Sequence, residues 1–300
     1  MNKVLVIGSL NYDSTFYVDN LPNEGETISS TDYKFSIGGK GANQGATLAK
    51  LALDVSMVGK IGKDSQGSQI KKELSDLGVN VDSILSCDNI TGQAFITVKK
   101  GGTNTIIIAG GANNDLSEGD IYACRSQIDE SSAVLLQLEI PLNTVNTALS
   151  LSKERNKLTV LNPAPAVKLD KDILSKVDIL IPNETELGVL VGESLKTEAE
   201  IKNACKFLVS QGVKIVIVTL GSNGCALYSD NKFTMFKAHK ATVVDTTAAG
   251  DSFIGGFLYS YLNNKVLNKA IDFGQKVSAI TVSREGALQA IPTIKEIINS

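Results

Sequence analysis

Short apolar runs alternate along this chain with amphipathic stretches, and this alternation constrains the fold more than any other feature. Six runs are typical of buried strands: 4–7, 55–58, 133–136, 158–161, 179–181 and 215–219. Between them, residues 42–53, 65–77, 144–152 and 197–210 have helical spacing of apolar residues, and 249–284 is nearly all helical. The pattern predicts a three-layer, Rossmann-like α/β fold, with a mostly parallel sheet and helices on both faces.

Two stretches, about 12–37 and 92–109, break this alternation. In the second, Gln93–Val98 and Thr103–Ile108 flank a turn at Lys100-Gly101-Gly102, a pattern typical of a β-hairpin. A hairpin does not easily join a parallel sheet, so we expect a small separate sheet over the ends of the main strands. Its apolar edge would close a pocket or pair with a second copy. We therefore expect a single domain, 1–300, into which these stretches are inserted as a small β layer.

Composition excludes several classes of protein. The chain has 300 residues, 43% of them hydrophobic, and a formal net charge of -3, with Lys and Arg scattered, so nucleic acid is not an expected partner. No apolar run reaches the length of a membrane span and no signal-peptide pattern is present, which predicts a cytoplasmic protein. The four cysteines lie far apart and are expected to be reduced thiols used in packing. The only histidine, His239, is expected at the surface or in a strand, so proton transfer must depend mainly on carboxylates.

Residues 245–253, Asp-Thr-Thr-Ala-Ala-Gly-Asp-Ser-Phe, give the strongest indication of chemistry. Ala248, Ala249 and Gly250 precede a predicted helix, whose first N–H groups and positive dipole end attract a phosphate-like anion. Asp251 repels such an anion, but it suits a base that takes a proton from an attacking hydroxyl. A capped helix with an acidic first turn would explain the same residues without catalysis.

Polar residues also follow other predicted strands, at the edge where open parallel sheets bind ligands. Asn11 and Asp13 follow the first strand and could hold the hydroxyls of a polyol, although both residue types are common in turns. Glu139 ends another strand, and Asn183 and Glu186 open a helix, either as caps or near nucleotide phosphates and Mg²⁺. Two loops add candidates: Gly38-Gly39-Lys40-Gly41-Ala42-Asn43-Gln44 and Thr219-Leu220-Gly221-Ser222-Asn223-Gly224. The first is not a Walker A loop, and no dinucleotide-binding Gly-x-Gly-x-x-Gly follows the first strand.

Three of these motifs resemble those of a known family. In chain order, 38–44, 183–186 and 245–253 are similar to the two signature regions and the Asn-x-x-Glu motif of the ribokinase (PfkB) family of carbohydrate kinases. The similarity runs from Gly8 to Pro292 and includes Asn162-Pro-Ala-Pro-Ala. The resemblance implies an enzyme that transfers phosphate from ATP to the 5-hydroxyl of D-ribose, in the presence of Mg²⁺ and K⁺.

The resemblance also assigns roles to single residues. Asp251 would be the base, and the amides of Ala248, Ala249 and Gly250 would form an anion hole. The sugar would be held by Asn11, Asp13, Gly39, Lys40, Gly41, Ala42, Asn43 and Glu139. The nucleotide would lie against Asn183, Thr219, Leu220, Gly221, Ser222, Asn223, Gly224, Gly250 and Gln275, with Glu186 orienting Mg²⁺ through water. Potassium would be held, largely by backbone carbonyls, at Asp245, Thr247, Thr281, Arg284 and Gly286. The small sheet would be a lid that also pairs two subunits.

Two positions depart from the family pattern. Gln275 stands where a histidine is common near the adenine, and Ala290 stands where a serine hydroxyl is common near potassium. A kinase for deoxyribose, fructose or a nucleoside is an alternative within the fold, and a noncatalytic sugar sensor is an alternative outside this class. Asn11 and Asp13 suit the ribose 2-hydroxyl, the few aromatic residues near the sugar motifs disfavour a nucleoside, and Asp251 disfavours a sensor.

Overall fold

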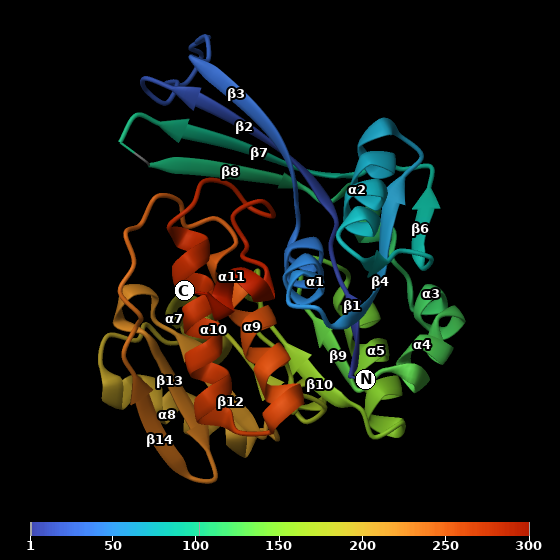
Figure 1. The fold of residues 1–300 in the computed structure, drawn as a ribbon, viewed down its shortest axis with the longest axis vertical. Helices are drawn as coiled ribbons and strands as arrows, with labels where there is room; N and C mark the ends of the chain where they lie inside the picture. The colour runs from blue at the N-terminus through green and yellow to red at the C-terminus, as the bar shows by residue number, and fades with distance from the viewer. Residues whose placement is uncertain (1, 102, 300) are drawn as a thin grey trace.

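The computed structural model describes residues 2–101 and 103–299, and within them the larger sheet has ten strands. Their order is β14-β13-β12-β11-β10-β9-β1-β4-β5, with β6 paired to β4 (Figure 1). The strands are β1 (Lys3–Ile7), β4 (Asp54–Gly62), β5 (Val79–Asn80), β6 (Ile84–Cys87), β9 (Ala133–Leu136), β10 (Leu158–Leu161), β11 (Ile179–Leu180), β12 (Ile215–Thr219), β13 (Cys225–Ser229) and β14 (Lys232–Phe236).

The predicted parallel sheet is confirmed. From β5 to β12 every pairing is parallel, whereas β12–β13 and β13–β14 are antiparallel. Strands β9, β10 and β12 have the predicted bounds, β1 and β4 contain the predicted runs, and β11 ends one residue early. The only polar residues in these runs are Ser56, Thr159 and Thr219, because helices cover both faces of the sheet.

The helices are α1 (Lys40–Lys50), α2 (Ser65–Asp76), α3 (Glu118–Ala123), α4 (Arg125–Glu130), α5 (Leu142–Glu154), α6 (Lys171–Leu174), α7 (Glu184–Val191), α8 (Glu198–Ser210), α9 (Ala249–Asn264), α10 (Leu267–Val282) and α11 (Ile294–Ile298), with short 3₁₀ turns η1 (Gly111–Asp115) and η2 (Gly221–Asn223). Leu5 and Ile7 of β1 pack in one apolar cluster with α5, α7 and α8. Val4 and Val6 pack in a second with α1, α2, α9 and α10. Alternate side chains of one strand therefore enter opposite helical layers.

The sequence analysis missed the antiparallel edge of this sheet. Strands β13 and β14 are joined at Asp230 and Asn231, whose φ angles are 49° and 60°. Two consecutive residues with positive φ are characteristic of a type I′ hairpin turn, which Asp and Asn tolerate better than most residues. The Asp-Asn pair between two short apolar runs was therefore a usable signal for this hairpin.

A second sheet of four strands, called the small sheet below, projects from the body of the molecule (Figure 1). Its order is β3 (Asp32–Gly38), β2 (Asn11–Val18), β7 (Gly92–Lys99) and β8 (Asn104–Ala109). The predicted hairpin is confirmed as the antiparallel pair β7–β8, although Gly102 of its turn lies outside the described residues. Strands β2 and β7 are parallel, so the small sheet joins two distant segments of the chain. Its exposed apolar residues include Tyr33, Phe35, Phe95, Ile106, Ile107 and Ile108.

Other expectations concern isolated residues. Within residues 2–101 and 103–299, none of the helices has both the length and the apolar character needed to span a bilayer. All four cysteines are free thiols; Cys205 and Cys225 are buried, and Cys87 and Cys124 are half-buried. His239 is half-exposed, and its Nε2 lies 2.9 Å from Asp272 Oδ1.

Candidate active site

Helix α9 begins at the carboxyl edge of the main sheet and presents its N-terminus to a cavity of about 230 Å³. Ala248 precedes the helix in the left-handed conformation (φ 58°), which turns the chain sharply into it. The N–H of Ala249 donates to Thr246 O at 3.2 Å, a long hydrogen bond that an incoming anion can displace. A Cβ placed on Gly250 would meet nothing within 4 Å, so the helix end faces open space. The predicted anion site therefore has room for a ligand.

Asp251, in the first turn of α9, is buried and fully engaged by amides. Asn43 Nδ2 donates to its Oδ2 at 3.0 Å, and Gln44 Nε2 donates to its Oδ1 at 2.9 Å. These two donors lie on α1, which begins in the glycine-rich connector, and α1 packs directly against α9. The two signature regions therefore meet at a carboxylate with a defined orientation.

Gln44 was not among the predicted site residues, although it is wholly buried. Besides Asp251, its Nε2 reaches Asn162 Oδ1 at 3.1 Å, and its Oε1 accepts from Gln137 Nε2 at 2.7 Å. Asn162 in turn donates to Ile181 O at 3.0 Å. Residues at the ends of β9, β10 and β11 thus hold the amide that holds Asp251. The four bonds join residues 19, 93, 118 and 207 positions apart, so the local sequence pattern gives no sign of them.

The small sheet contributes its first strand to the same place. Asn11 begins β2, and Asp13 follows two residues later on the same side of the strand. Gly38 pairs with Asn11 across the sheet, and a Cβ on Gly38 would overlap both carboxyl oxygens of Asp13. Asp13 Oδ1 is buried without a hydrogen-bond partner among the described residues. The carboxylate is therefore confined but unsatisfied.

A third predicted carboxylate closes this side of the site. Glu139 Oε2 accepts from Ser9 Oγ at 2.5 Å and from the Lys40 backbone N–H at 3.1 Å. Gly39 has a φ of 87°, and a Cβ on Gly39 or Gly41 would overlap the backbone around Ser9. The Ala42 N–H donates to Ser9 O at 3.1 Å. The glycines of the connector therefore allow α1 to begin in contact with the carboxyl end of β1.

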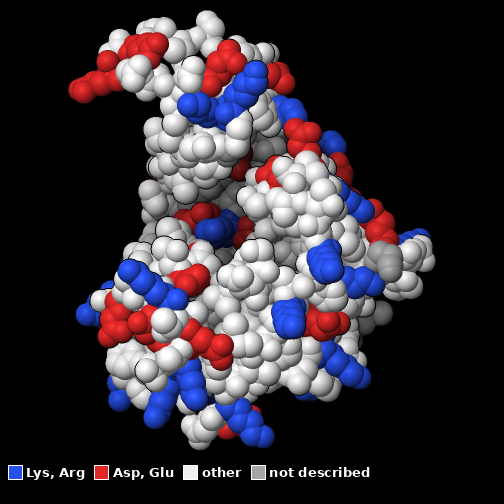
Figure 2. All heavy atoms as spheres, turned by 90° about the vertical axis from the view of Figure 1, so that its left-hand side faces the viewer, with Lys and Arg blue, Asp and Glu red and all other residues white. Residues whose placement is uncertain are grey.

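These carboxylates act on one another electrostatically. Burial, with the neighbouring carboxylates of Glu139 and Asp251, raises the pKa of Asp13 from 3.8 to about 7. Burial alone would lower the pKa of Lys40, but the carboxylates of Asp251, Glu139 and Glu186 raise it above its usual value. Lys40 therefore stays protonated at neutral pH and supplies a half-buried positive charge to a group of acids. Figure 2 shows a deep hollow between the small sheet and the body, with acidic and basic side chains on its floor.

The predicted nucleotide residues fall into two groups. Asn183 and Glu186 form a capping box at the start of α7: Glu186 N–H donates to Asn183 Oδ1, and the Asn183 N–H donates to Glu186 Oε2, both at 2.8 Å. Burial raises the pKa of Glu186. Thr219 pairs with Asn183 in an isolated parallel bridge. The cavity is lined by Lys40, Asn162, Ile181, Asn183, Glu186, Thr219, Thr246, Ala248, Ala249, Gly250, Asp251 and Ile254.

The second group, Leu220 to Gly224 and Gln275, does not line the cavity, although Leu220 directly follows Thr219, which does. Leu220 to Gly224 form a tight turn in which Leu220 N–H donates to Gly224 O at 2.9 Å. Gly221, Ser222 and Asn223 are exposed. Gln275 of α10 is buried, and its Nε2 donates to Cys225 Sγ at 3.5 Å. Cys225 follows the turn directly, so Gln275 and the turn are neighbours.

The predicted potassium residues lie together around Asp245. Its Oδ1 accepts from the Thr247 N–H and hydroxyl at 2.9 and 2.7 Å, and its Oδ2 accepts from the Gly286 N–H at 2.9 Å. The Asp245 N–H donates to Val282 O at 3.2 Å, which brings the loop to the end of α10. Thr281 and Arg284 flank that carbonyl, joined by a backbone hydrogen bond of 3.1 Å. Two segments that are distant in sequence thus form one connected cluster beside α9.

A helix N-terminus with a buried carboxylate in its first turn, at the carboxyl edge of a parallel sheet, is an arrangement suited to phosphoryl transfer. Residues 1–294 match the pfkB family carbohydrate kinase domain. The chain belongs to this family of carbohydrate kinases.

Characterised relatives cover nearly the whole chain. A ribokinase of Haemophilus influenzae is 38% identical over 300 residues, covering 99% of this chain and 98% of the relative. A deoxyribokinase of Salmonella typhi is 34% identical over 296 residues, covering 98% of this chain and 96% of the relative. The structure of an Arabidopsis thaliana ribokinase complexed with ribose and ATP superposes with a TM-score of 0.92, at 34% identity and with 99% and 98% of the two chains covered.

Proposed function

We propose that this protein is a ribokinase, which transfers the γ-phosphoryl group of ATP to the 5-hydroxyl of D-ribose to give D-ribose 5-phosphate and ADP. The observation that carries the proposal is the placement of a buried, amide-held Asp251 in the first turn of α9, beside an open cavity at the helix N-terminus. The identity to ribokinases along the full chain supports ribose as the sugar.

In this proposal Asp251 accepts the proton of the sugar hydroxyl as its oxygen bonds to the γ-phosphorus. The bond from that phosphorus to the ADP oxygen breaks in line, and the Ala248 to Gly250 amides stabilise the charge on the transferring group. Asn43 and Gln44 keep the carboxylate aimed at the hydroxyl, since each donates to a different oxygen. The Asp251 carboxylate is therefore oriented before the sugar binds, so no free energy is needed to orient it at the chemical step.

The sugar lies between the small sheet and α1 in this proposal. Its hydroxyls bind Asp13 and Asn11 from β2, Asn43 from α1 and Glu139 from the end of β9, and Gly39 to Ala42 shape the floor. Among these proposed sugar ligands, two buried oxygens have no protein partner in the described residues, Asp13 Oδ1 and Asn43 Oδ1. Sugar hydroxyls are donors that would satisfy both, which supports a polyol as the ligand.

The nucleotide phosphates lie in the cavity, with the remainder of ATP along Thr219 to Gly224 and Gln275. Lys40 and the N-terminus of α9 place positive charge at the phosphates. Glu186 faces the same cavity and would hold Mg²⁺ through water, because both of its oxygens are already capped by Asn183. When bound, Mg²⁺ neutralises charge on the phosphates.

Potassium would be held by Asp245, Thr247, Thr281, Arg284 and Gly286, whose connected arrangement beside α9 fits a cation ligated largely by backbone carbonyls. The ion would set the electrostatic field of the loop without touching the sugar. Ala290 follows Gly286 by four residues and is buried, and its side chain cannot offer a hydroxyl ligand. Equal turnover in potassium and in a large inert cation would remove this part of the proposal.

The small sheet would serve as a lid on the sugar and as the contact between two subunits. Ile107 is 69% exposed on β8, amid other exposed apolar residues. Such a patch is unusual on a monomer surface. Replacing Ile107 with Lys should shift sedimentation from dimer to monomer, whereas the same change at exposed Val266 should not. Unchanged sedimentation of Ile107→Lys would refute the lid as the contact. A cytoplasmic location stays a prediction from sequence.

ADP release from ATP and Mg²⁺ tests the proposed reaction. Purified protein is assayed with D-ribose, 2-deoxyribose, fructose and adenosine, each with and without potassium. We expect the highest kcat/KM with D-ribose. A preference for 2-deoxyribose would favour the second candidate, which the 34% identical deoxyribokinase supports. Ribose binding without ADP release from any sugar would indicate a sensor.

A further inference from the structure

Asn113, in the 3₁₀ turn η1, is a fully buried amide that has no part in the proposed reaction, yet it contacts a proposed sugar ligand. It is 1% exposed. Its Nδ2 donates to Asn11 Oδ1 at 2.7 Å and to Leu10 O at 3.2 Å, while its Oδ1 accepts from the Leu10 N–H at 2.9 Å. Asn113 thus holds the point where the chain leaves β1 and enters the small sheet.

The hydrogen-bond pattern fixes the orientation of both amides. A backbone N–H can only donate, so the Leu10 N–H requires Asn113 Oδ1 on its side. Asn113 must then turn its Nδ2 toward Asn11, which requires Asn11 to turn its Oδ1 toward Asn113. The hydrogen bond to Asn113 uses Asn11 Oδ1, and Asn11 Nδ2 donates to no protein group in the described part of the chain. The Leu10 N–H therefore sets the orientation of the Asn113 amide, which in turn sets the orientation of the Asn11 amide. As a result, Asn11 directs its Nδ2 away from Asn113.

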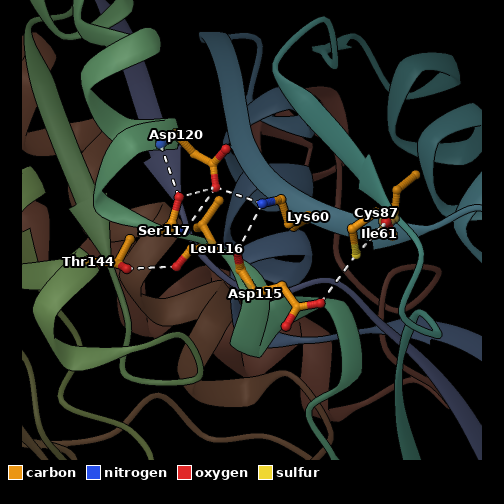
Figure 3. Close-up of polar contacts among 8 residues, drawn as sticks. All are labelled: Lys60, Ile61, Cys87, Asp115, Leu116, Ser117, Asp120 and Thr144. Carbon is orange, nitrogen blue, oxygen red and sulfur yellow. Dashed lines mark hydrogen bonds and ion pairs between the residues drawn. The ribbon is translucent and has the colours of Figure 1, made fainter.

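The surroundings of Asn113 are built to keep this contact. Gly92 begins β7, and a Cβ there would overlap both Asn113 Nδ2 and Asn11 Oδ1, so a glycine is needed where the two amides meet. At the start of η1, the Ala112 N–H donates to Ile90 O at 2.7 Å. At its end, Lys60 of β4 donates to Asp115 O at 2.9 Å and to Asp120 Oδ2 at 2.7 Å, as Figure 3 shows. The turn is therefore attached to the small sheet on one side and to the main sheet on the other.

We propose that Asn113 is a positioning residue, which fixes the side-chain amide of Asn11 so that its Nδ2, and not its Oδ1, faces the sugar. The inference rests on the proposed function, because it takes Asn11 as a sugar ligand. Asn113 contacts neither substrate nor Asp251, so it acts on sugar affinity and not on the chemical step.

A double-mutant cycle tests whether Asn113 acts through Asn11. Asn113→Asp keeps the size of the side chain and an acceptor for the Leu10 N–H, but it replaces the donor that faces Asn11. Binding of D-ribose is measured by calorimetry for the wild type, N11A, N113D and N11A/N113D, and kcat is measured at saturating ribose. We expect N113D to weaken ribose binding about tenfold in the wild-type background and less than about twofold in the N11A background. The kcat should change by less than about threefold.

Asn114→Asp is the matched control, since Asn114 is the exposed neighbour in the same turn and acquires the same charge. It should leave ribose affinity unchanged. An N113D effect of equal size in both backgrounds would mean that Asn113 does not act through Asn11, and no effect would also overturn the proposal. A wild type that binds ribose without releasing ADP would refute the kinase function while leaving the cycle interpretable.

A measurement on the wild type covers the case in which N113D does not fold, as judged by circular dichroism. The side-chain NH₂ signals of Asn11 are assigned in an NMR spectrum by their loss in N11A, and ribose is then added. Both proton signals should move, because the proposal places Nδ2 at the sugar. Signals that stay in place at saturating ribose would refute it.

Discussion

Asp251 at the start of α9 and Asp13 at the start of β2 are two carboxylates of one site, but they differ in how far protein groups satisfy them. Both oxygens of Asp251 accept hydrogen bonds from side-chain amides. Asp13 has a buried oxygen without a partner among the described residues, and its pKa is raised to about 7. The main body thus holds the proposed base with both oxygens hydrogen-bonded, whereas the small sheet carries a proposed sugar ligand with one oxygen left for a ligand to satisfy. The carboxylate proposed for chemistry is therefore oriented before the substrate binds, whereas the carboxylate proposed for sugar binding destabilises the folded protein until the sugar binds.

The largest effect should follow from removing the proposed base. Asp251→Asn keeps the shape and one acceptor oxygen but removes the basic group, so turnover should fall by about 100-fold or more while ribose affinity changes little. Steady-state ADP release and calorimetry with ribose measure the two quantities. Asp272→Asn, on the exposed side of α10, is the control and should keep full turnover. Unchanged turnover of D251N would refute the assignment of the base.

Removing a hydrogen-bond donor to Asp251 should leave one of its oxygens without a partner, as is the case for Asp13. Gln44→Ala leaves Asp251, Asn162 and Gln137 each short of one buried hydrogen bond. We expect a loss of about 1–3 kcal/mol in the free energy of unfolding and a fall in turnover of about tenfold. Urea unfolding gives the first value, with Gln69→Ala on the exposed face of α2 as control. Wild-type stability of Q44A would show that this amide network is not structural.

Replacing the unsatisfied carboxylate of Asp13 should weaken sugar binding but stabilise the fold. Asp13→Asn should weaken ribose binding about tenfold, since it removes an acceptor, and should raise the free energy of unfolding at pH 8 by about 1–2 kcal/mol. The folded pKa of Asp13, about 7, lies above 3.8, so its ionisation destabilises the folded state as pH rises between these values. The stabilising effect of D13N should therefore disappear near pH 4. A destabilised D13N at pH 8 would contradict the comparison.

The smallest effect concerns pH in the wild-type protein. If ribose binds ionised Asp13, its affinity should fall about fivefold between pH 7 and pH 6, because an increasing fraction of the free protein carries the proton. Calorimetry in buffers of different ionisation enthalpy would show proton release on binding that rises from about half a proton at pH 7 towards one at pH 6. The D13N variant should lack both the pH dependence and the proton release. An affinity that stays constant from pH 6 to 8 in the wild type would exclude Asp13 as the titrating ligand.

The main architecture could be predicted from sequence because burial on both faces leaves a clear local signal. In β9, β10 and β12 every residue is apolar except Thr159 and Thr219, and the bounds of these strands follow from their apolar runs. β14, at the edge of the sheet, has only exposed and half-buried residues, and β5 has two residues, so neither has a comparable run. The small sheet could be predicted as a separate layer from its hairpin, but the parallel pairing of β2 with β7 depends on contacts that no local pattern encodes.

The site was predictable where its residues belong to short motifs. Asp251, Asn43, Glu186 and Glu139 were predicted in this way, and the structure brings them to one edge of the sheet. Gln44, Gln137 and Asn113 were not assigned roles, because their importance lies in bonds to partners 93 to 207 positions away. A buried amide in a sequence looks the same whether it packs, caps a helix or orients another side chain.

The parallel pairing of β2 with β7 also dictates an order of events during synthesis. The β2–β3 hairpin leaves the ribosome well before Gly92, and β4 and α2 lie between them in the chain. At about 5–20 residues per second, the edge of β2 waits several seconds for its neighbour. Until then, the exposed Tyr33 and Phe35 have only a two-stranded hairpin around them, which is marginally stable by itself. Nascent chains of this protein should therefore be most prone to chaperone capture and to mispairing with one another in this interval, before the kinase exists as a folded molecule.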